Sequence, residues 1–339
     1  MSVIVMTKPP SPIALLFPGQ GSQAVGMGKE LAGNYQVARR TFEEADEALG
    51  YKLSELCFAG PEEKLKLTEI TQPAILTASV AAWRVLQERG LKADVVPGVV
   101  SYYVAGHSLG EYSAHVAAGT LSFADVVRTV RNRGKYMQEA VPVGVGAMAA
   151  ILGMPYDQVA EIAAEVANEV ASDTAQGEVC QAANINSPEQ IVISGHAGAV
   201  GRAIKLAAER GAKRAISLPV SAPFQCSLMQ PAQDRLAADL SALNFHNPSC
   251  PVVCNVDAAE VASAEAAREA LIRQVTGTVR WEPSMRLLIE KGVGLFIEIG
   301  PGKVLSGLMR QIDRSQTCVT VGDEVSLEKT LAQVEALAA

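Results

Sequence analysis

The stretch Tyr102–Tyr112 reads YYVAGHSLGEY, and the rest of the chain is organised around it. The residues before Gly106 are β-branched or aromatic and predict a buried strand that begins near Val99. The residues after Gly110 are apolar and alanine-rich and predict a helix that runs to Ala118. Between them lies a G-x-S-x-G sequence. Strand, tight turn with a serine, then helix is the arrangement of a nucleophile elbow.

The spacing of this motif has a chemical reason. Glycines on both sides of Ser108 allow the backbone to turn sharply without a Cβ clash. The turn presents the Ser108 hydroxyl at the start of a helix, where unpaired N–H groups can stabilise a developing oxyanion. Ser108 is therefore the candidate nucleophile. The alternative is a chance G-x-S-x-G, and the strand before it and the helix after it argue against chance.

Length and composition limit the class of protein. The chain has 339 residues, of which 49% are hydrophobic and 19% charged, so it can form two domains or one large domain with an insertion. No apolar run approaches the ~20 residues of a membrane span. The N-terminal sequence MSVIVMTKPPSP lacks the pattern of a signal peptide. We therefore expect a cytoplasmic protein.

Charge and cysteine content exclude further classes. A net charge of −7 argues against nucleic acid as the main partner. The six cysteines form no C-x-x-C pair, which predicts buried free thiols rather than disulfides or a metal site.

A second candidate ligand-binding segment lies near the N-terminus. Ile13–Phe17 predicts a buried strand, and the loop after it reads PGQGSQ (18–23). Two glutamines beside two glycines at the carboxyl end of a strand are well placed to meet a ligand. An ordinary strand-to-helix loop with a serine cap is the alternative. A long helical pattern follows and runs to about Leu49, and further helices are predicted over Thr71–Arg89 and, capped by its first residue, Ser122–Val141.

Residues 142–216 differ in pattern from the rest of the chain. They predict, in chain order, a strand over 147–152, a helix over 156–170, strands over 179–185 and 190–194, a helix over 199–210 and a strand over 213–218. This β-α-β-β-α-β order is typical of the ferredoxin-like fold. The predicted fold class is therefore α/β, with a ferredoxin-like (α+β) subdomain at 142–216 inserted in a larger body formed by 1–141 and 217–339.

The larger body continues after the insertion. Its predicted elements are a helix over 227–243, a strand over 252–256, helices over 265–275 and 281–291, a strand over 295–299 and a helix over 304–310.

Seven motifs, in family order, resemble the acyl-CoA:acyl-carrier-protein transacylases, and within them the malonyl-CoA:acyl-carrier-protein transacylases of fatty acid synthesis. The motifs span essentially the whole chain and read FPGQGSQ (17–23), TQPAILTAS (71–79), GHSLGEY (106–112), RGKYMQEAVP (133–142), NINSP (184–188), LPVSAPFQCSLM (218–229) and IEIGPGKVL (297–305). The resemblance implies an α/β-hydrolase-like core with an inserted ferredoxin-like subdomain, in agreement with the pattern of elements.

The resemblance also implies an activity. A malonyl group would pass from malonyl-CoA to the phosphopantetheine thiol of acyl carrier protein through a covalent acyl-Ser108 intermediate. Gln20 and the backbone N–H of Leu109 would form or support the oxyanion hole. The implied partners are malonyl-CoA and acyl carrier protein, with no cofactor, metal, nucleic acid or membrane, and we expect a monomer.

Further residues of the acyl site follow from the same resemblance. Arg133 would hold the free carboxylate of malonate in a bidentate pair, which lysine could not reproduce. Gln274 matches the position whose backbone carbonyl orients the catalytic histidine, Asn255 matches a residue near the site, and His107 belongs to the nucleophile motif. Phe224 matches a position where phenylalanine accompanies selection of malonyl over methylmalonyl. A wall there would discriminate by only ~1–3 kcal/mol, and ordinary core packing is the alternative.

One position departs from the family. Gln225 stands where the family has its catalytic histidine, and a neutral amide cannot accept a proton near pH 7. We therefore expect impaired activity, from either an engineered substitution made to trap an acyl-enzyme or a natural low-activity variant. No other histidine is a good replacement, because His107 has its own place in the motif and His115 is predicted in the core. His196 and His246 fall in the subdomain and in a late loop.

Two other functions remain open. A serine hydrolase on a similar core would order its triad Ser…Asp/Glu…His, so His246 would be the base with Asp239 as a possible acid. A non-catalytic module would bind acyl carrier protein without ever acylating Ser108, which the Gln225 departure makes conceivable.

Overall fold

The computed structural model describes residues 11–91, 102–168 and 177–338. Its strands are β1 (Ile13–Phe17), β2 (Tyr102–Gly106), β3 (Gly146–Leu152), β4 (Cys180–Ser187), β5 (Gln190–His196), β6 (Arg214–Ser217), β7 (Val252–Cys254), β8 (Ala259–Val261), β9 (Leu295–Ile299) and β10 (Cys318–Val321).

The α-helices are α1 (Lys29–Asn34), α2 (Gln36–Leu49), α3 (Leu53–Ala59), α4 (Glu62–Leu65), α5 (Thr68–Glu88), α6 (Leu109–Ala117), α7 (Phe123–Glu139), α8 (Tyr156–Asn168), α9 (Ala197–Glu209), α10 (Gln230–Ser241), α11 (Ala264–Arg273), α12 (Trp281–Glu290), α13 (Val304–Ile312) and α14 (Glu324–Ala338). A short 3₁₀ helix, η1 (Ser227–Met229), precedes α10.

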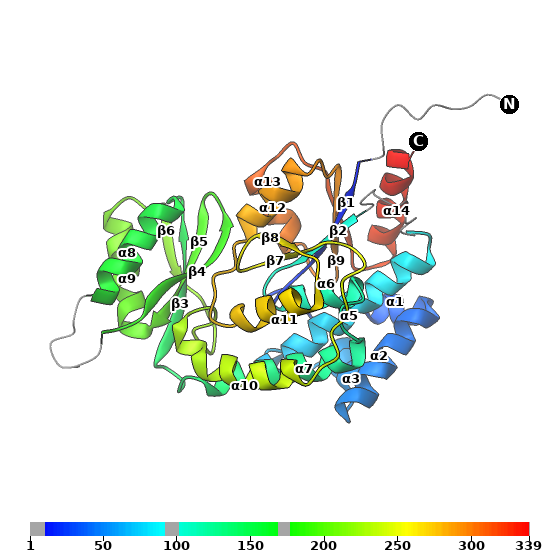
Figure 1. Cartoon of the computed structure of the whole chain (residues 1–339), viewed down its shortest axis with the longest axis horizontal. Coiled ribbons are helices and arrows are strands. Elements are labelled where there is room, and N and C mark those ends of the chain that lie inside the picture. The colour runs from blue at the N-terminus through cyan, green and yellow to red at the C-terminus, as the bar shows by residue number, and fades with distance from the viewer. Residues whose placement is uncertain (1–10, 92–101, 169–176, 339) are drawn as a thin grey trace.

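The larger sheet has six strands in the order β10-β9-β1-β2-β7-β8, all parallel except the edge strand β8. Helices cover both of its faces, with α12 and α13 on one side and α2, α5 and α7 on the other (Figure 1). Strand β1 reads as a continuous apolar run for this reason, since Leu15 and Phe17 pack into one core while Ala14 and Leu16 pack into the other.

Strand register brings the two predicted ligand loops together. Strands β1 and β2 are parallel neighbours, and Phe17 pairs with Gly106 at their carboxyl ends. The PGQGSQ loop and the serine turn therefore leave the same edge of the sheet side by side. The buried strand expected to begin near Val99 is β2; its first residues, 99–101, lie outside the described residues.

The smaller sheet is formed entirely between residues 146 and 217, and its four antiparallel strands run in the order β4-β5-β3-β6. The predicted β-α-β-β-α-β order of elements is confirmed. Helices α8 and α9 pack on one face of this sheet, at the left end of the molecule in Figure 1. A small apolar cluster on the sheet, which includes Met148 and Val192, packs against Leu218 and Phe224 of the following loop.

Several predicted helix bounds were wrong. The single helical pattern up to Leu49 is two helices, α1 and α2, separated by Tyr35 in an extended conformation (φ −120°). The helix predicted over 227–243 begins as the 3₁₀ helix and becomes α-helical only at Gln230. Helices α3 and α4 and strand β8 were not predicted, because each is shorter than the window over which periodicity is visible.

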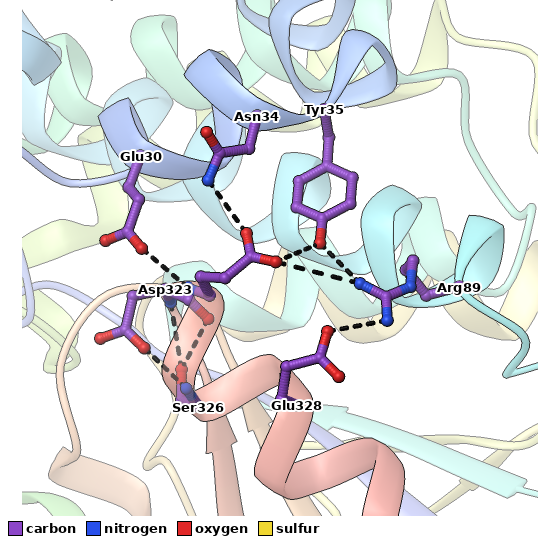
Figure 2. Close-up of polar contacts among 8 residues, drawn as sticks. Glu30, Asn34, Tyr35, Arg89, Asp323, Ser326 and Glu328 are labelled. Carbon is purple, nitrogen blue, oxygen red and sulfur yellow. Dashed lines mark hydrogen bonds and ion pairs between the residues drawn. The ribbon is translucent and has the colours of Figure 1, made fainter.

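The break at Tyr35 coincides with a polar clasp on the C-terminal helix (Figure 2). The hydroxyl of Tyr35 donates to Glu324 at 2.6 Å, and the Asn34 amide donates to the same carboxylate at 3.0 Å. Arg89, at the end of α5, donates to the Tyr35 hydroxyl at 2.6 Å and pairs with Glu328 at 2.7 Å. The clasp holds the start of α14 against the end of α1, the residue between α1 and α2, and the end of α5.

Of the described residues, no helix is long and apolar enough to cross a membrane. All six cysteines are free thiols.

Candidate active site

Ser108 lies in the sharp turn between β2 and α6 with φ 49° and ψ −104°. A non-glycine residue rarely adopts positive φ, so the surroundings must hold this conformation. The two flanking glycines have ordinary φ values and are needed for space. A Cβ on Gly106 would lie 1.9 Å from the Gly110 carbonyl carbon, and one on Gly110 would lie 2.0 Å from the Phe17 oxygen.

Asn255 holds both sides of the turn. It lies directly after β7, which ends at Cys254 although the predicted strand ran to Val256. Its side-chain oxygen accepts from the Ser108 N–H at 2.7 Å, and its amide nitrogen donates to the Gly106 carbonyl at 2.7 Å. Leu109 is the first residue of α6, and its backbone N–H has no acceptor among the described residues. The next two N–H groups, of Gly110 and Glu111, donate within the turn.

Gln225 occupies the position expected for the general base, and the structure brings it to the nucleophile. The Ser108 hydroxyl donates to its side-chain oxygen at 2.8 Å. Its amide nitrogen donates to the Gly277 carbonyl at 3.0 Å and to the Gln274 carbonyl. Like Ser108, Gln225 has positive φ (58°). The two backbone acceptors fix which end of the amide faces Ser108.

Arg133 is the buried cation of the site, only 2% exposed. Its guanidinium donates to the Ser108 hydroxyl at 3.1 Å, to the Gln72 side-chain oxygen at 2.8 Å and to the Gln274 side-chain oxygen at 3.0 Å. Burial lowers the pKa of Arg133 from its ordinary value, and the nearby Tyr112 and Glu111 oppose that shift. No carboxylate forms an ion pair with Arg133 within the described parts of the chain.

Gln274 and Glu111 lie beneath the turn, and both are fully buried. The Gln274 amide donates to the Ser108 carbonyl and to the Glu111 carboxylate, each at 2.8 Å. The same Glu111 oxygen accepts from the Asn255 backbone N–H at 2.9 Å. Burial raises the pKa of Glu111 to about 7, although its bonds from Gln274 and Asn255 and the charge of Arg133 favour the ionised form.

His107 connects the turn to the smaller sheet. One ring nitrogen, Nε2, is hydrogen-bonded to the Asn186 side-chain oxygen on β4 at 2.8 Å. Its ring packs against that of Trp281 at 5.5 Å between centroids. Burial lowers the pKa of His107, so the neutral ring is favoured near pH 7 and donates to Asn186 through Nε2.

These residues surround a cavity of about 470 Å³ between the two sheets. Ser108, Arg133, His107, Phe224 and Gln225 line it. The PGQGSQ loop contributes Gln20, whose side chain is exposed, and the far wall is largely apolar. Every residue predicted for the site therefore lines the cavity or contacts one that does.

The remaining histidines lie elsewhere. His115 is fully buried on α6 with no partner for either ring nitrogen among the described residues, so the predicted core position is confirmed. His196 accepts from the Val179 N–H, and His246 is exposed beside Asn244. Asp239 accepts from Asn132 and Tyr136 rather than from a histidine. The structure does not bring the hydrolase pair His246 and Asp239 to Ser108.

Two site residues were missed in the sequence. Gln72 lies within the TQPAILTAS motif but was given no role, and its signal is a polar side chain on the buried helix α5. Glu111 is likewise a charged residue in the first turn of a helix that is almost entirely buried. Such exceptions to the apolar pattern mark polar groups that a neighbouring element must satisfy.

Residues 14–332 match the acyl transferase domain family, and the chain belongs to that family. It is 50% identical to the malonyl CoA-acyl carrier protein transacylase of Bacillus subtilis, over 94% of this chain and 96% of that protein. It is 47% identical to the protein of the same name from Salmonella typhimurium, over 94% and 99%.

Solved structures agree with these relatives. The malonyl CoA-acyl carrier protein transacylase from Coxiella burnetii superposes with a TM-score of 0.89 at 42% identity, over 95% of this chain and 98% of that one. A malonyl-transacylase solved in complex with a type II polyketide acyl-carrier protein gives a TM-score of 0.88 at 47% identity, over 95% and 100%.

Proposed function

We propose that the chain transfers a malonyl group from malonyl-CoA to the phosphopantetheine thiol of acyl carrier protein, through a covalent ester on Ser108. The observation that carries this proposal is Arg133. A buried guanidinium 3.1 Å from the nucleophile, with no carboxylate paired to it in the described chain, calls for an acyl group that brings its own carboxylate. A malonyl thioester is such a donor.

The reaction has two halves. In the first, Ser108 Oγ forms a bond to the thioester carbonyl carbon, the carbon–sulfur bond breaks, and the serine proton ends on coenzyme A as its thiol. In the second, the thiol sulfur of the carrier protein forms a bond to the ester carbonyl carbon, the bond from that carbon to Ser108 Oγ breaks, and the thiol proton returns to Ser108 Oγ. The Leu109 N–H, with Gln20, stabilises the oxyanion in both halves. The balance requires no cofactor.

We expect both halves to be slow in this chain. Gln225 accepts the hydrogen bond that positions the serine proton, yet an amide oxygen cannot take that proton away. General acid–base catalysis contributes typically ~10²–10⁴-fold, and this contribution is missing. Once formed, the Ser108 ester should persist, because nothing at this position activates the incoming thiol or water.

The arrangement of the two sheets supports a division of the chain into a core and an inserted subdomain. We infer that residues 1–141 and 217–339 form an α/β-hydrolase-like acyltransferase core and that residues 142–216 form a ferredoxin-like subdomain. The sheet order β4-β5-β3-β6 supports the second assignment. Phe224 would be a wall against branched acyl groups. A monomeric, cytoplasmic enzyme remains our expectation.

Intact-mass measurement after exposure to malonyl-CoA or acetyl-CoA tests the proposal. We expect slow addition of one malonyl group and much less addition of acetyl. The Ser108→Ala variant, which keeps the cavity and Arg133, should gain neither. Absence of any adduct on the parent chain would favour the non-catalytic carrier-binding alternative, and release of free malonate without transfer would favour a hydrolase.

A further inference from the structure

Glu111 is a buried carboxylate that the reaction above does not use. It lies on α6 in the turn that follows Ser108 and is 0% exposed. Within the described residues no lysine, arginine or histidine forms an ion pair with it. Burying a carboxylate without an ion pair is unfavourable, so its neighbours should explain why it is there.

Glu111 anchors two segments that arrive from distant parts of the chain. Its Oε2 atom accepts from the backbone N–H of Asn255, 144 residues away, at 2.9 Å. The same atom accepts from the side-chain amide of Gln274, 163 residues away, at 2.8 Å. Both donors also contact the nucleophile turn, through the Ser108 N–H and the Ser108 carbonyl.

The contact with Gln274 determines how that amide is oriented. A carboxylate only accepts hydrogen bonds, as does the Ser108 carbonyl, so the Gln274 NH₂ group must face both. Its oxygen then points the other way and accepts from the Arg133 guanidinium at 3.0 Å. If the amide were turned over, its NH₂ group would face the guanidinium and the contact would be lost.

We propose that Glu111 is a positioning residue for acyl selection: it orients the Gln274 amide, which holds Arg133 beside Ser108. The role rests on the proposed malonyl transfer, in which Arg133 meets the substrate carboxylate. Glu111 itself touches neither the substrate nor the reacting atoms. Its removal should therefore change which acyl group is preferred more than it changes the fold.

The test compares Glu111→Gln with Glu298→Gln. Glu298 is a matched control, because it is equally buried and accepts from two backbone N–H groups and the Ser306 hydroxyl at the start of α13, away from the cavity. The readout is the ratio of Ser108 acylation rates with malonyl-CoA and acetyl-CoA. We expect Glu111→Gln to lower this ratio about tenfold, as for coupled residues of one network. Glu298→Gln should lower the melting temperature and leave the ratio unchanged.

A double-mutant cycle with Gln274→Ala tests the route of the effect. In that background Glu111→Gln should change the ratio by less than about twofold, because the amide it orients is gone. Crystal structures should show the Arg133 guanidinium displaced from Ser108 in Glu111→Gln and unmoved in Glu298→Gln. If Glu111→Gln does not fold, Glu111→Asp keeps the charge but withdraws it from Gln274, and it should give the same fall in ratio.

An unchanged ratio, additive effects in the cycle, or an unmoved Arg133 would overturn the positioning role. A parent chain that takes malonyl and acetyl groups equally would instead contradict the proposed function. The position of Arg133 in the variant crystals then decides the role of Glu111 separately, since it does not depend on the acyl donor.

Discussion

The Ser108 hydroxyl donates a hydrogen bond of 2.8 Å to the side-chain oxygen of Gln225, whose amide nitrogen is held by two backbone carbonyls. The amide therefore reproduces one part of what a histidine would do at this position, which is to orient the serine proton. It cannot reproduce the other part, which is to accept that proton. Geometry and proton transfer are thus separated in this chain, and each can be tested alone.

Gln225→His should restore proton transfer. We expect the malonyl transfer rate to rise by roughly 10²–10⁴-fold. Stability should change little, because histidine tolerates positive φ better than most residues and one ring nitrogen can donate to the Gln274 carbonyl. Gln225→Asn is the control, since it is also an amide and should stay slow. Transfer rates from steady-state assays decide, and an unchanged rate in Gln225→His would mean that another base operates.

Arg133→Ala should abolish the preference for a carboxylate-bearing donor. Breaking a buried charge pair typically costs about 3 kcal/mol, so the malonyl-to-acetyl ratio should fall more than a hundredfold. Arg133→Lys should recover only part of it, because an ammonium cannot make the bidentate contact. Arg131→Ala is the matched control, because Arg131 lies on the same helix as Arg133 but its guanidinium packs over the Tyr51 ring. If Arg131→Ala changed the ratio equally, the selectivity would not reside in Arg133.

Gly110→Ala should destabilise the nucleophile turn severely. The new methyl group would lie 2.0 Å from the Phe17 oxygen, and the backbone on both sides is buried. We expect a loss of at least about 3 kcal/mol, in the range of severe overpacking. Gly201→Ala, on α9 with nothing within 4 Å of its added Cβ, should instead gain a few tenths to about 1 kcal/mol. Chemical denaturation of both variants would check the contrast.

Stability should depend on pH through two buried groups, whose effects on the free energy of unfolding have opposite signs. The pKa of Glu111 is raised from 4.5 to about 7, so the folded state binds more protons between these values and loses stability as pH rises. The pKa of His115 is lowered from 6.5 to about 4 by burial, so the unfolded state binds more protons and stability rises with pH. In the shared window the two effects oppose each other in the parent chain.

Single variants separate these two groups. Relative to the parent, the free energy of unfolding of Glu111→Gln should rise by up to about 3 kcal/mol as pH rises from 4.5 to 7. The free energy of unfolding of His115→Leu, relative to the parent, should rise as pH falls from 6.5 towards 4. Urea unfolding across this range measures both differences. Parallel pH profiles for all three proteins would show that neither group titrates as its burial implies.

Features that depend on a few neighbouring residues could be predicted from the sequence. The strand, turn and helix around Ser108 are an example, and so is the Ser122 cap, which accepts from the Asp125 N–H at 3.2 Å. The order of elements in 142–216 could be predicted as well, because each element has its own periodicity of apolar residues.

Features that depend on distant partners could not. The helix break at Tyr35 coincides with a hydrogen bond to Glu324, 289 residues away, and no residue near Tyr35 in the sequence predicts the break. Gln274 and Asn255 entered the predicted site only through the family resemblance, since their bonds to Ser108 span 166 and 147 residues. Gln72 and Glu111 were visible only as polar exceptions on apolar helices, which identifies buried groups without saying what they bind.

The sequence distance between Ser108 and Asn255 also limits when the site can form during synthesis. The conformation of Ser108 is held by a side chain that is made 147 residues later, and Gln274 follows after that. Until these two residues have been translated, neither of the bonds that they make to Ser108 can form. A nascent chain should react with thioesters only after residues up to Gln274 have been translated. Fragments that end before β7 should fold in part, but their Ser108 should not be acylated by thioesters.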